Sequence, residues 1–293
     1  MLKRQKVILA ILECVDRPLD RIVLVKYAFL LSQETELRNE PAFYNFVPYK
    51  YGPFSFTLYH ELENLRRGRY VVLSETEVAV EANARKSAAR KAAELPSQAR
   101  YAVQSVLGRY DRMCRNSLLK DVYRRYPWYA TSSELTDLVR NRAPKLRRAR
   151  IAVYTVGYEG KSIDGFLNGL LRTGIRTIID VRANPVSRKY GFAGKSLARI
   201  AGRVGLAYHH FPELGIPTSR RAGLTDMESY RVLLNRYESQ LVSRQKQDVL
   251  RVVRLVRETP SALLCMEADV QRCHRGRLAL AAGRASGLPV VHL

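Results

Sequence analysis

Three side chains that can move protons follow short apolar segments in the C-terminal half of the sequence: Asp180, Glu267 and His274. Asp180 ends the segment TIID, and Glu267 comes two residues after the segment LLC. A carboxylate in such a place is either desolvated or paired, and both conditions shift its pKa. Two carboxylates from adjacent strand ends can act as a general acid or base and as a stabiliser of charge. We therefore predict that Asp180, Glu267 and His274 are catalytic.

Cationic, aromatic and hydroxyl side chains lie close to these positions in the sequence. Arg182, Arg188 and Arg275 each carry a planar guanidinium that can bind two phosphate oxygens at once. This composition predicts a surface that binds phosphate or nucleic acid. The residues assigned to that surface are Tyr158, Lys161, Arg182, Ser187, Arg188, Lys189 and Arg275.

Short apolar segments and amphipathic segments alternate through the C-terminal half and must position these residues. The expected strands are residues 151–157, 176–182, 206–212, 261–267 and 288–293, and the expected helices are residues 162–174, 196–205, 227–258 and 274–285. Regular alternation of this kind predicts an α/β fold with a Rossmann-like parallel sheet and helices on both faces. Ligands of such sheets bind at the carboxyl ends of the strands, where the predicted site residues lie.

The N-terminal half has the spacing of a mainly helical, winged-helix-like domain. Apolar residues at intervals of three and four predict helices over 5–15, 20–33 and 55–67, and alternation over 69–81 predicts a hairpin. Gly52 and Pro53 are expected to mark a turn before the third helix. A helical extension follows over 84–140, and the basic segment 141–150 is typical of an exposed linker. We expect domains at 1–82 and 149–293, joined by the extension and linker at 83–148.

The chain of 293 residues carries 50 Lys and Arg against 27 Asp and Glu, a net charge of +23. Basic residues are in excess in both halves, so no separate basic tail accounts for the charge. Such an excess favours a polyanionic partner. We expect nucleic acid, with DNA favoured over RNA, and RNA stays an alternative because basic and aromatic residues do not separate the two. Apolar segments are too short to cross a membrane, and unpaired cysteine spacing without an apolar leader predicts a cytoplasmic protein that has no membrane partner.

The motifs for common cofactors are missing from the sequence. Neither a Gly-x-x-x-x-Gly-Lys-Ser/Thr loop nor a Gly-x-Gly-x-x-Gly segment is present, so we expect no nucleotide cofactor of those types and no other cofactor. Cys265, Cys273 and His274 match no closed zinc spacing, and we expect neighbours at a helix start not to point inward together. Cys265 is expected to act as a small core residue. The prediction is that the protein holds no metal.

Four segments of the C-terminal half resemble the domain-of-unknown-function 488 family of prokaryotic proteins. They are TVGYEGKSIDGFL, IIDVRANPVSRKYGF, YHHFPELG and LLCMEADVQRCHR. The last segment is the most specific, because it matches the family's Cys-x-Glu and Cys-His-Arg run. The sequence has Gly157 and Tyr158 where the family pattern commonly has Gly-His.

The N-terminal segment FVPYKYGPFSFTLYHELENL is similar to the Tyr-Gly-Pro segment of SocA-like, antitoxin-associated domains. This resemblance implies a winged-helix-like adaptor. Winged helices usually place a helix in the major groove of duplex DNA. They also mediate protein contacts, so a role in forming a homodimer stays open.

These observations favour a DNA-binding enzyme, most of all a DNA glycosylase that hydrolyses the N-glycosidic bond of a damaged or modified base in repair or defence. Such an enzyme needs a carboxylate, cations for phosphates and aromatic rings that stack a flipped base. Tyr158, Tyr190 and Tyr208 are available for stacking. A metal-dependent nuclease would use the same carboxylates. A regulator or antitoxin-like protein that binds DNA without catalysis is the other alternative.

Overall fold

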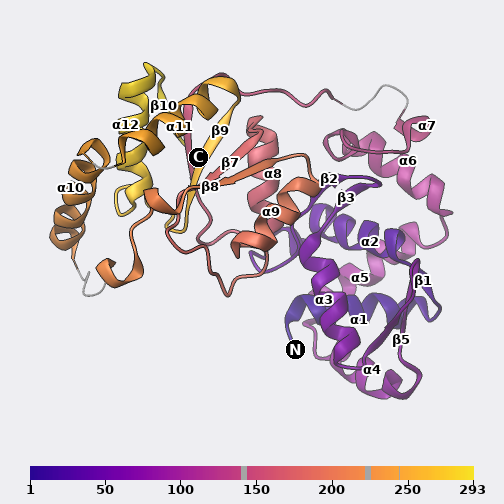
Figure 1. The fold of residues 1–293 in the computed structure, drawn as a ribbon. Coiled ribbons are helices and arrows are strands. Elements are labelled where there is room, and N and C mark those ends of the chain that lie inside the picture. The colour runs from indigo at the N-terminus through magenta and orange to yellow at the C-terminus, as the bar shows by residue number, and fades with distance from the viewer. Residues whose placement is uncertain (140–143, 222–225, 244) are drawn as a thin grey trace. The chain divides into compact units, whose positions relative to one another are not determined.

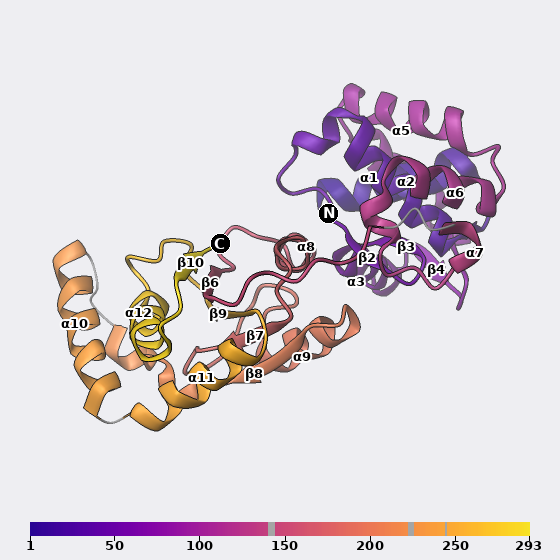
Figure 2. The same ribbon diagram turned by 90° about the horizontal axis from the view of Figure 1, so that it is seen from above.

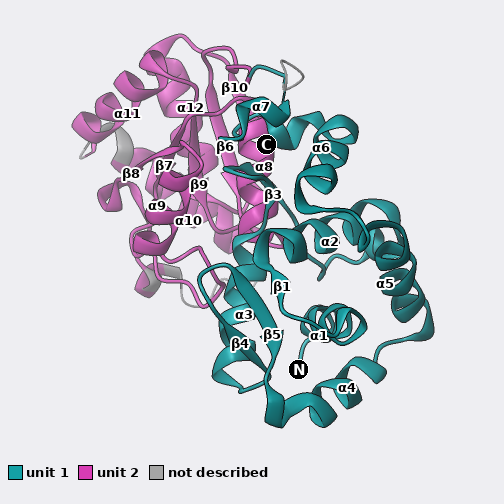
Figure 3. Cartoon of the chain, turned by 90° about the vertical axis from the view of Figure 1, so that its right-hand side faces the viewer, with its two compact units in different colours: residues 1–145 teal, residues 146–293 magenta. Residues whose placement is uncertain are grey.

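A computed structural model describes residues 1–139, 144–221, 226–243 and 245–293 of the protein. The chain forms two compact units, residues Met1–Lys145 and Leu146–Leu293, which Figure 3 shows in different colours. Within the described ranges, no helix is long and apolar enough to cross a membrane.

The first unit begins with the winged-helix-like arrangement that the sequence predicts. It contains α1 (Lys3–Val15), α2 (Arg21–Glu34) and α3 (Phe56–Arg67), and a sheet in which β1 (Leu19–Asp20), β5 (Glu77–Val80) and β4 (Val71–Leu73) lie in that order. Local sequence sets the helix starts: Asp20 accepts hydrogen bonds from the backbone at the start of α2, and Ser55 accepts one at the start of α3.

The aromatic segment between α2 and α3 forms a hairpin of β2 (Val47–Tyr49) and β3 (Gly52–Phe54). The turn of this hairpin consists of residues 50–51 and lies directly before Gly52 and Pro53, which were expected to mark it and which belong to β3. Gly52 instead begins the second strand with φ at +91°, and a Cβ there would lie 2.5 Å from Cε1 of Tyr123. Close packing against Tyr123 explains the glycine.

The expected helical extension consists of α4 (Arg85–Ala93), α5 (Ser97–Tyr110), α6 (Arg115–Arg125) and α7 (Thr136–Val139). Helices α4 and α5 pack on α1, and α5 and α6 pack on α2, so these helices belong to the first compact unit. Residues 140–143, which include the start of the expected basic linker, lie outside the described residues. Residues 144–150 form neither helix nor strand.

The second unit contains the predicted parallel sheet, with strands β6 (Val153–Gly157), β7 (Thr177–Asp180), β8 (Ala207–His210), β9 (Ser261–Cys265) and β10 (Val290–His292). Their order is β10-β6-β9-β7-β8, and every neighbouring pair is parallel. Strand β9 lies between β6 and β7, and its last residue, Cys265, pairs with Gly157 at the end of β6. The loop that follows β9 is therefore flanked by the loops that follow β6 and β7.

Helices cover both faces of this sheet, as the α/β prediction requires. Figures 1 and 2 show α8 (Ile163–Thr173) and α9 (Gly194–Arg203) on one side, and α11 (Lys246–Glu258) and α12 (His274–Ser286) on the other. The single helix expected over 227–258 is wrong, because α10 (Met227–Ser243) and α11 are separate helices. Gln245 lies outside helical geometry, and its side-chain amide donates to the backbone carbonyl of Glu213.

Candidate functional site

Two cysteines and a histidine meet at the carboxyl end of the sheet. Cys265 ends β9, Cys273 is the residue before α12, and His274 is the first residue of that helix. All three are buried, and the two sulfurs and one imidazole nitrogen lie within 4.8 Å of one another. The Cys265 Sγ is 3.9 Å from His274 Nδ1.

The expectation that Cys273 and His274 would not both point inward is therefore wrong. Cys273 has extended backbone angles, with φ at −130° and ψ at 133°, and so lies outside the helix. Helical spacing does not fix its side-chain direction relative to that of His274. Both side chains can face Cys265 for this reason. Cys265 itself is fully buried, as expected for a small core residue.

The His274 ring is held in place by its Nε2, the nitrogen that points away from Cys265. Its Nε2 lies 2.9 Å from the backbone carbonyl oxygen of Val181, which can only accept, so Nε2 carries the proton. In the neutral ring Nδ1 then has the lone pair that faces Cys265. The Tyr237 ring packs against the imidazole edge to face, with centroids 5.3 Å apart.

The two thiols differ in acidity. Burial raises the pKa of Cys273, and the adjacent Cys265 and Glu267 raise it further. The adjacent Cys273 side chain lowers the pKa of Cys265, although burial opposes this effect. Cys265 is thus the thiol that ionises first.

Glu267 lies beside this cluster and is half-buried. The Cys273 thiol donates to its Oε2 over 3.0 Å. Arg275 is 2% exposed and donates to the backbone carbonyls of Glu267 and Ala268, which holds the loop in place. A Cβ on Gly157 would lie 1.9 Å from the same Glu267 carbonyl oxygen, so only glycine lets the loop pass the end of β6. Arg275, predicted to bind phosphate, instead positions Glu267.

Asp180 and Arg182 form a second buried arrangement, at the end of β7. Arg182 donates to both carboxylate oxygens of Asp180, and Tyr208 donates to Oδ2 over 2.7 Å. The remaining terminal nitrogen of Arg182 donates to the Phe192 carbonyl and to the Tyr158 hydroxyl. Burial opposes the charge on Arg182, but its hydrogen bonds to Asp180 raise its pKa. The geometry favours a structural role for this pair over catalysis or phosphate binding.

The other predicted phosphate-binding residues differ in their surroundings. Tyr158 is 4% exposed and stacks on Phe192, with ring centroids 4.3 Å apart, so the face of its ring that contacts Phe192 is closed to a base. Lys161 is exposed, and partial burial of its ammonium and the nearby Arg275 lower its pKa. The Ser187 hydroxyl accepts from the backbone of Lys189, within a loop whose Arg188 and Lys189 are exposed.

Helix α9 carries an exposed row of cations that the sequence analysis did not predict. Lys195, Arg199 and Arg203 are each exposed, and their spacing of four residues puts them on one face of the helix. No described carboxylate forms an ion pair with these three. Burial and the charge of Asp164 raise the pKa of Tyr190. The nearby Arg199 and Arg203 oppose this rise. The period of the cations in GKSLARIAGR is a signal that could have identified this face.

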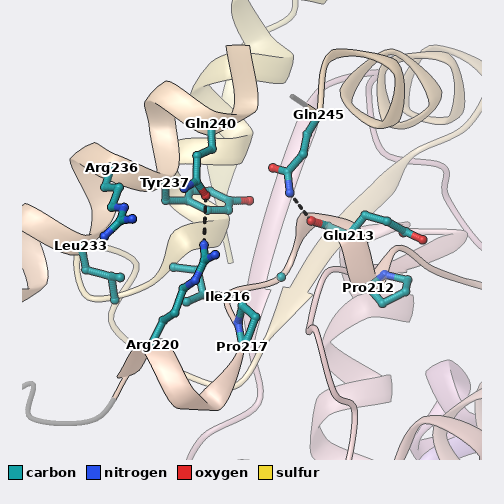
Figure 4. Close-up of a pocket in the computed structure, with 11 residues that line it drawn as sticks. Pro212, Glu213, Ile216, Pro217, Arg220, Leu233, Arg236, Tyr237, Gln240 and Gln245 are labelled. Carbon is teal, nitrogen blue, oxygen red and sulfur yellow. Dashed lines mark hydrogen bonds between the residues drawn. The ribbon is translucent and has the colours of Figure 1, made fainter. Parts of the chain in front are cut away.

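A cavity of about 490 Å³ opens beyond β8, between the segment after that strand and α10. Figure 4 shows Arg220 and Arg236 on one side of it and Gln245 on the other. Arg220 donates to Gln240 over 3.3 Å, and Tyr237 donates to the Leu214 carbonyl over 2.6 Å. Charged and amide side chains therefore line this cavity, and Tyr237 connects its wall to His274.

Comparison with protein families finds one similarity, in the α/β unit. Residues 162–281 match the model of the family described as Domain of unknown function DUF488. The match contains Asp180, Glu267, Cys273 and His274, and it supports the resemblance predicted for the C-terminal half. Comparison with curated proteins and with solved structures gives no match. The SocA-like resemblance of the N-terminal region stays a prediction.

Proposed function

We propose that this protein binds DNA and that its α/β unit hydrolyses the N-glycosidic bond of a damaged or modified base, in repair or defence. The observation that carries the proposal is Glu267, a half-buried carboxylate at the carboxyl end of the sheet. Its backbone is held by Arg275, whereas the other predicted carboxylate, Asp180, is occupied by Arg182 and Tyr208. Of the two carboxylates, Glu267 is the one that is partly exposed to solvent, and its Oε2 accepts from the Cys273 thiol.

In this reaction the Glu267 carboxylate would activate water or stabilise positive charge that develops on the sugar. The reaction adds water across the bond between base and sugar, so the products are a free base and an abasic sugar. Exposed cations in the loops at the same end of the sheet would neutralise charge on DNA: Lys161 after β6, and Arg188 and Lys189 after β7.

Support for DNA as the partner comes from the exposed cations of the α/β unit. Lys195, Arg199 and Arg203 form a row that spans about 12 Å at 1.5 Å per residue, and no described carboxylate neutralises it. Arg188 and Lys189 lie in the loop just before α9 and are also exposed. A row of cations next to an aromatic ring suits a nucleic-acid backbone with unstacked bases.

Hydrolysis of the phosphodiester bond is the second candidate, and the cluster of Cys265, Cys273 and His274 favours it. These side-chain types bind metal ions, and metal ions activate water for attack on phosphate. A regulator that binds DNA without catalysis would need neither Glu267 nor this cluster.

The first experiment tests catalysis on labelled duplexes that carry normal, damaged and modified bases, without added metal, with magnesium and with zinc. We expect strand breaks only after alkali, because alkali cleaves abasic sites. Glu267→Gln should lower the rate by at least about 10²-fold, the usual contribution of a general acid or base. Glu258→Gln is the matched control, since Glu258 is an exposed residue of α11 that pairs with Arg254. Direct breaks that need either added metal would identify a nuclease, and binding without products would favour the regulator.

The second experiment tests the DNA-binding surface by salt dependence. Replacing Lys195, Arg199 and Arg203 by Ala should reduce the slope of log affinity against log salt by about 2 to 3, since each phosphate contact contributes about 0.9. The control replaces Arg231, Arg251 and Arg254 by Ala, which removes the same charge from residues paired with carboxylates. Equal slopes for the two triple variants would place DNA on another surface.

A further inference from the structure

We propose that Cys265, Cys273 and His274 bind a zinc ion, which the sequence did not predict. The three ligand atoms come from the end of β9 and the start of α12 and lie within 4.8 Å of one another. This goes beyond the proposed function, because it holds whichever bond the α/β unit cleaves.

The separations suit a tetrahedral ion after small adjustments. Zn–S bonds of about 2.3 Å and Zn–N bonds of about 2.0 Å place neighbouring ligand atoms about 3.5 to 3.8 Å apart. Cys265 Sγ and His274 Nδ1 are already 3.9 Å apart. Rotation of the Cys273 side chain can close the remaining distances, and this rotation requires the thiol to give up its hydrogen bond to Glu267.

The choice of zinc follows from the ligand types. Two thiolates and one imidazole form a soft donor set that selects zinc over magnesium or calcium, which prefer oxygen ligands. Each ligand is at most 2% exposed, so the ion would be shielded from water on the sheet side.

The surroundings of the histidine are those of a metal ligand. Its Nε2 donates to the Val181 carbonyl, which directs Nδ1 toward the sulfurs and fixes the tautomer that a metal requires. The other nitrogen, Nδ1, faces the Cys265 sulfur at 3.9 Å.

An access route and a free coordination position are both available. Cys273 lines a cavity of about 590 Å³ beside α10, so an ion can reach the cluster. The Glu267 carboxylate contacts Cys273 but is not part of the three-residue cluster. Three protein ligands with a carboxylate beside them leave the fourth position for water, as in zinc sites that perform hydrolysis.

The test measures metal in the purified 293-residue chain and needs no substrate. We expect about one zinc ion per chain, and X-ray absorption at the zinc edge should show two sulfur neighbours at about 2.3 Å. Cys265→Ser and Cys273→Ser should each lower zinc content at least about tenfold. The Cys14→Ser/Cys114→Ser variant is the matched control, because both cysteines are exposed residues of the first unit, and it should keep its zinc.

A measurement on the unmodified chain covers the case in which the cysteine variants fail to fold. After chelation, added Co²⁺ should produce the thiolate-to-cobalt absorption and visible bands of a tetrahedral site. Zinc that survives both cysteine substitutions would overturn the proposal. So would a disulfide between Cys265 and Cys273, or a folded chain that takes up neither metal.

Discussion

Two arginines are buried at the same end of the sheet, and they are used in different ways. Arg182 binds the side-chain oxygens of Asp180, so each charge neutralises the other. Arg275 binds backbone carbonyls of the loop after β9 and leaves the Glu267 carboxylate to the neighbouring thiol. An arginine near a carboxylate can therefore either bind its oxygens directly or fix the backbone that carries it. The hydrogen-bond partners of the arginine distinguish the two roles.

We expect the largest loss of stability when the ion pair between Asp180 and Arg182 is broken. Arg182→Met leaves a fully buried carboxylate without its cation, which should cost about 3 to 5 kcal/mol of stability. Arg275→Met removes two hydrogen bonds to carbonyls and should cost less, about 1 to 3 kcal/mol. Hydrogen exchange of β7 and β9 peptides in the full-length protein measures both opening free energies. Equal losses of opening free energy in the two variants would contradict the difference proposed between the two arginines.

Lys26 in α2 is a third buried cation and sharpens the comparison, because lysine can lose its proton where arginine cannot. It is 2% exposed, and its ammonium donates to the Pro53 carbonyl over 3.0 Å. Burial lowers its pKa to about 7, although Asp20 opposes the shift. Like Arg275 it has a carbonyl partner, and at neutral pH part of the population has no charge to neutralise.

This difference predicts how stability changes with pH. Between pH about 7 and about 10 the unfolded chain keeps a proton that folded Lys26 has lost, so the free energy of unfolding should rise by up to about 1.4 kcal/mol per unit. Below that range both states are protonated and the full burial penalty applies. Lys26→Met should remove the rise. Fluorescence of the single tryptophan, Trp128, reports unfolding of the first unit. Parallel curves for the two proteins would contradict the assignment.

The sequence was sufficient to predict the parallel sheet and the end of it at which polar residues gather. Alternating periods of two and 3.6 residues report which faces are buried, and these determined the strands and helices of the α/β unit. The pairing of Asp180 with Arg182 was also foreseeable in part, because residues two apart on a strand point to one face. The spacing does not predict which hydrogen-bond partner each charged side chain has.

The Cys265, Cys273 and His274 cluster was not predicted because it depends on one backbone conformation. Treating Cys273 and His274 as neighbours on a helix separates their side chains, whereas the extended angles of Cys273 bring them together. The break between α10 and α11 is similar, because the contact between Gln245 and the Glu213 carbonyl joins residues 32 apart in the chain. Both features arise from tertiary contacts that local patterns do not record.

The smallest losses of stability are expected from variants that remove single hydrogen bonds around Asp180 and Arg182. Tyr208→Phe removes a 2.7 Å hydrogen bond to the carboxylate and should cost about 2 kcal/mol, since bonds to charged groups are strong. Tyr158→Phe removes only an acceptor at 3.3 Å from Arg182, whose same nitrogen also donates to the Phe192 carbonyl at 2.9 Å, so the loss should stay below about 1 kcal/mol. Hydrogen exchange of the β7 peptide compares the two. If Tyr158→Phe proved the more costly change, the Tyr158 hydroxyl would be essential to the orientation of Arg182, and the pair would depend on the stacked ring as well as on its own charges.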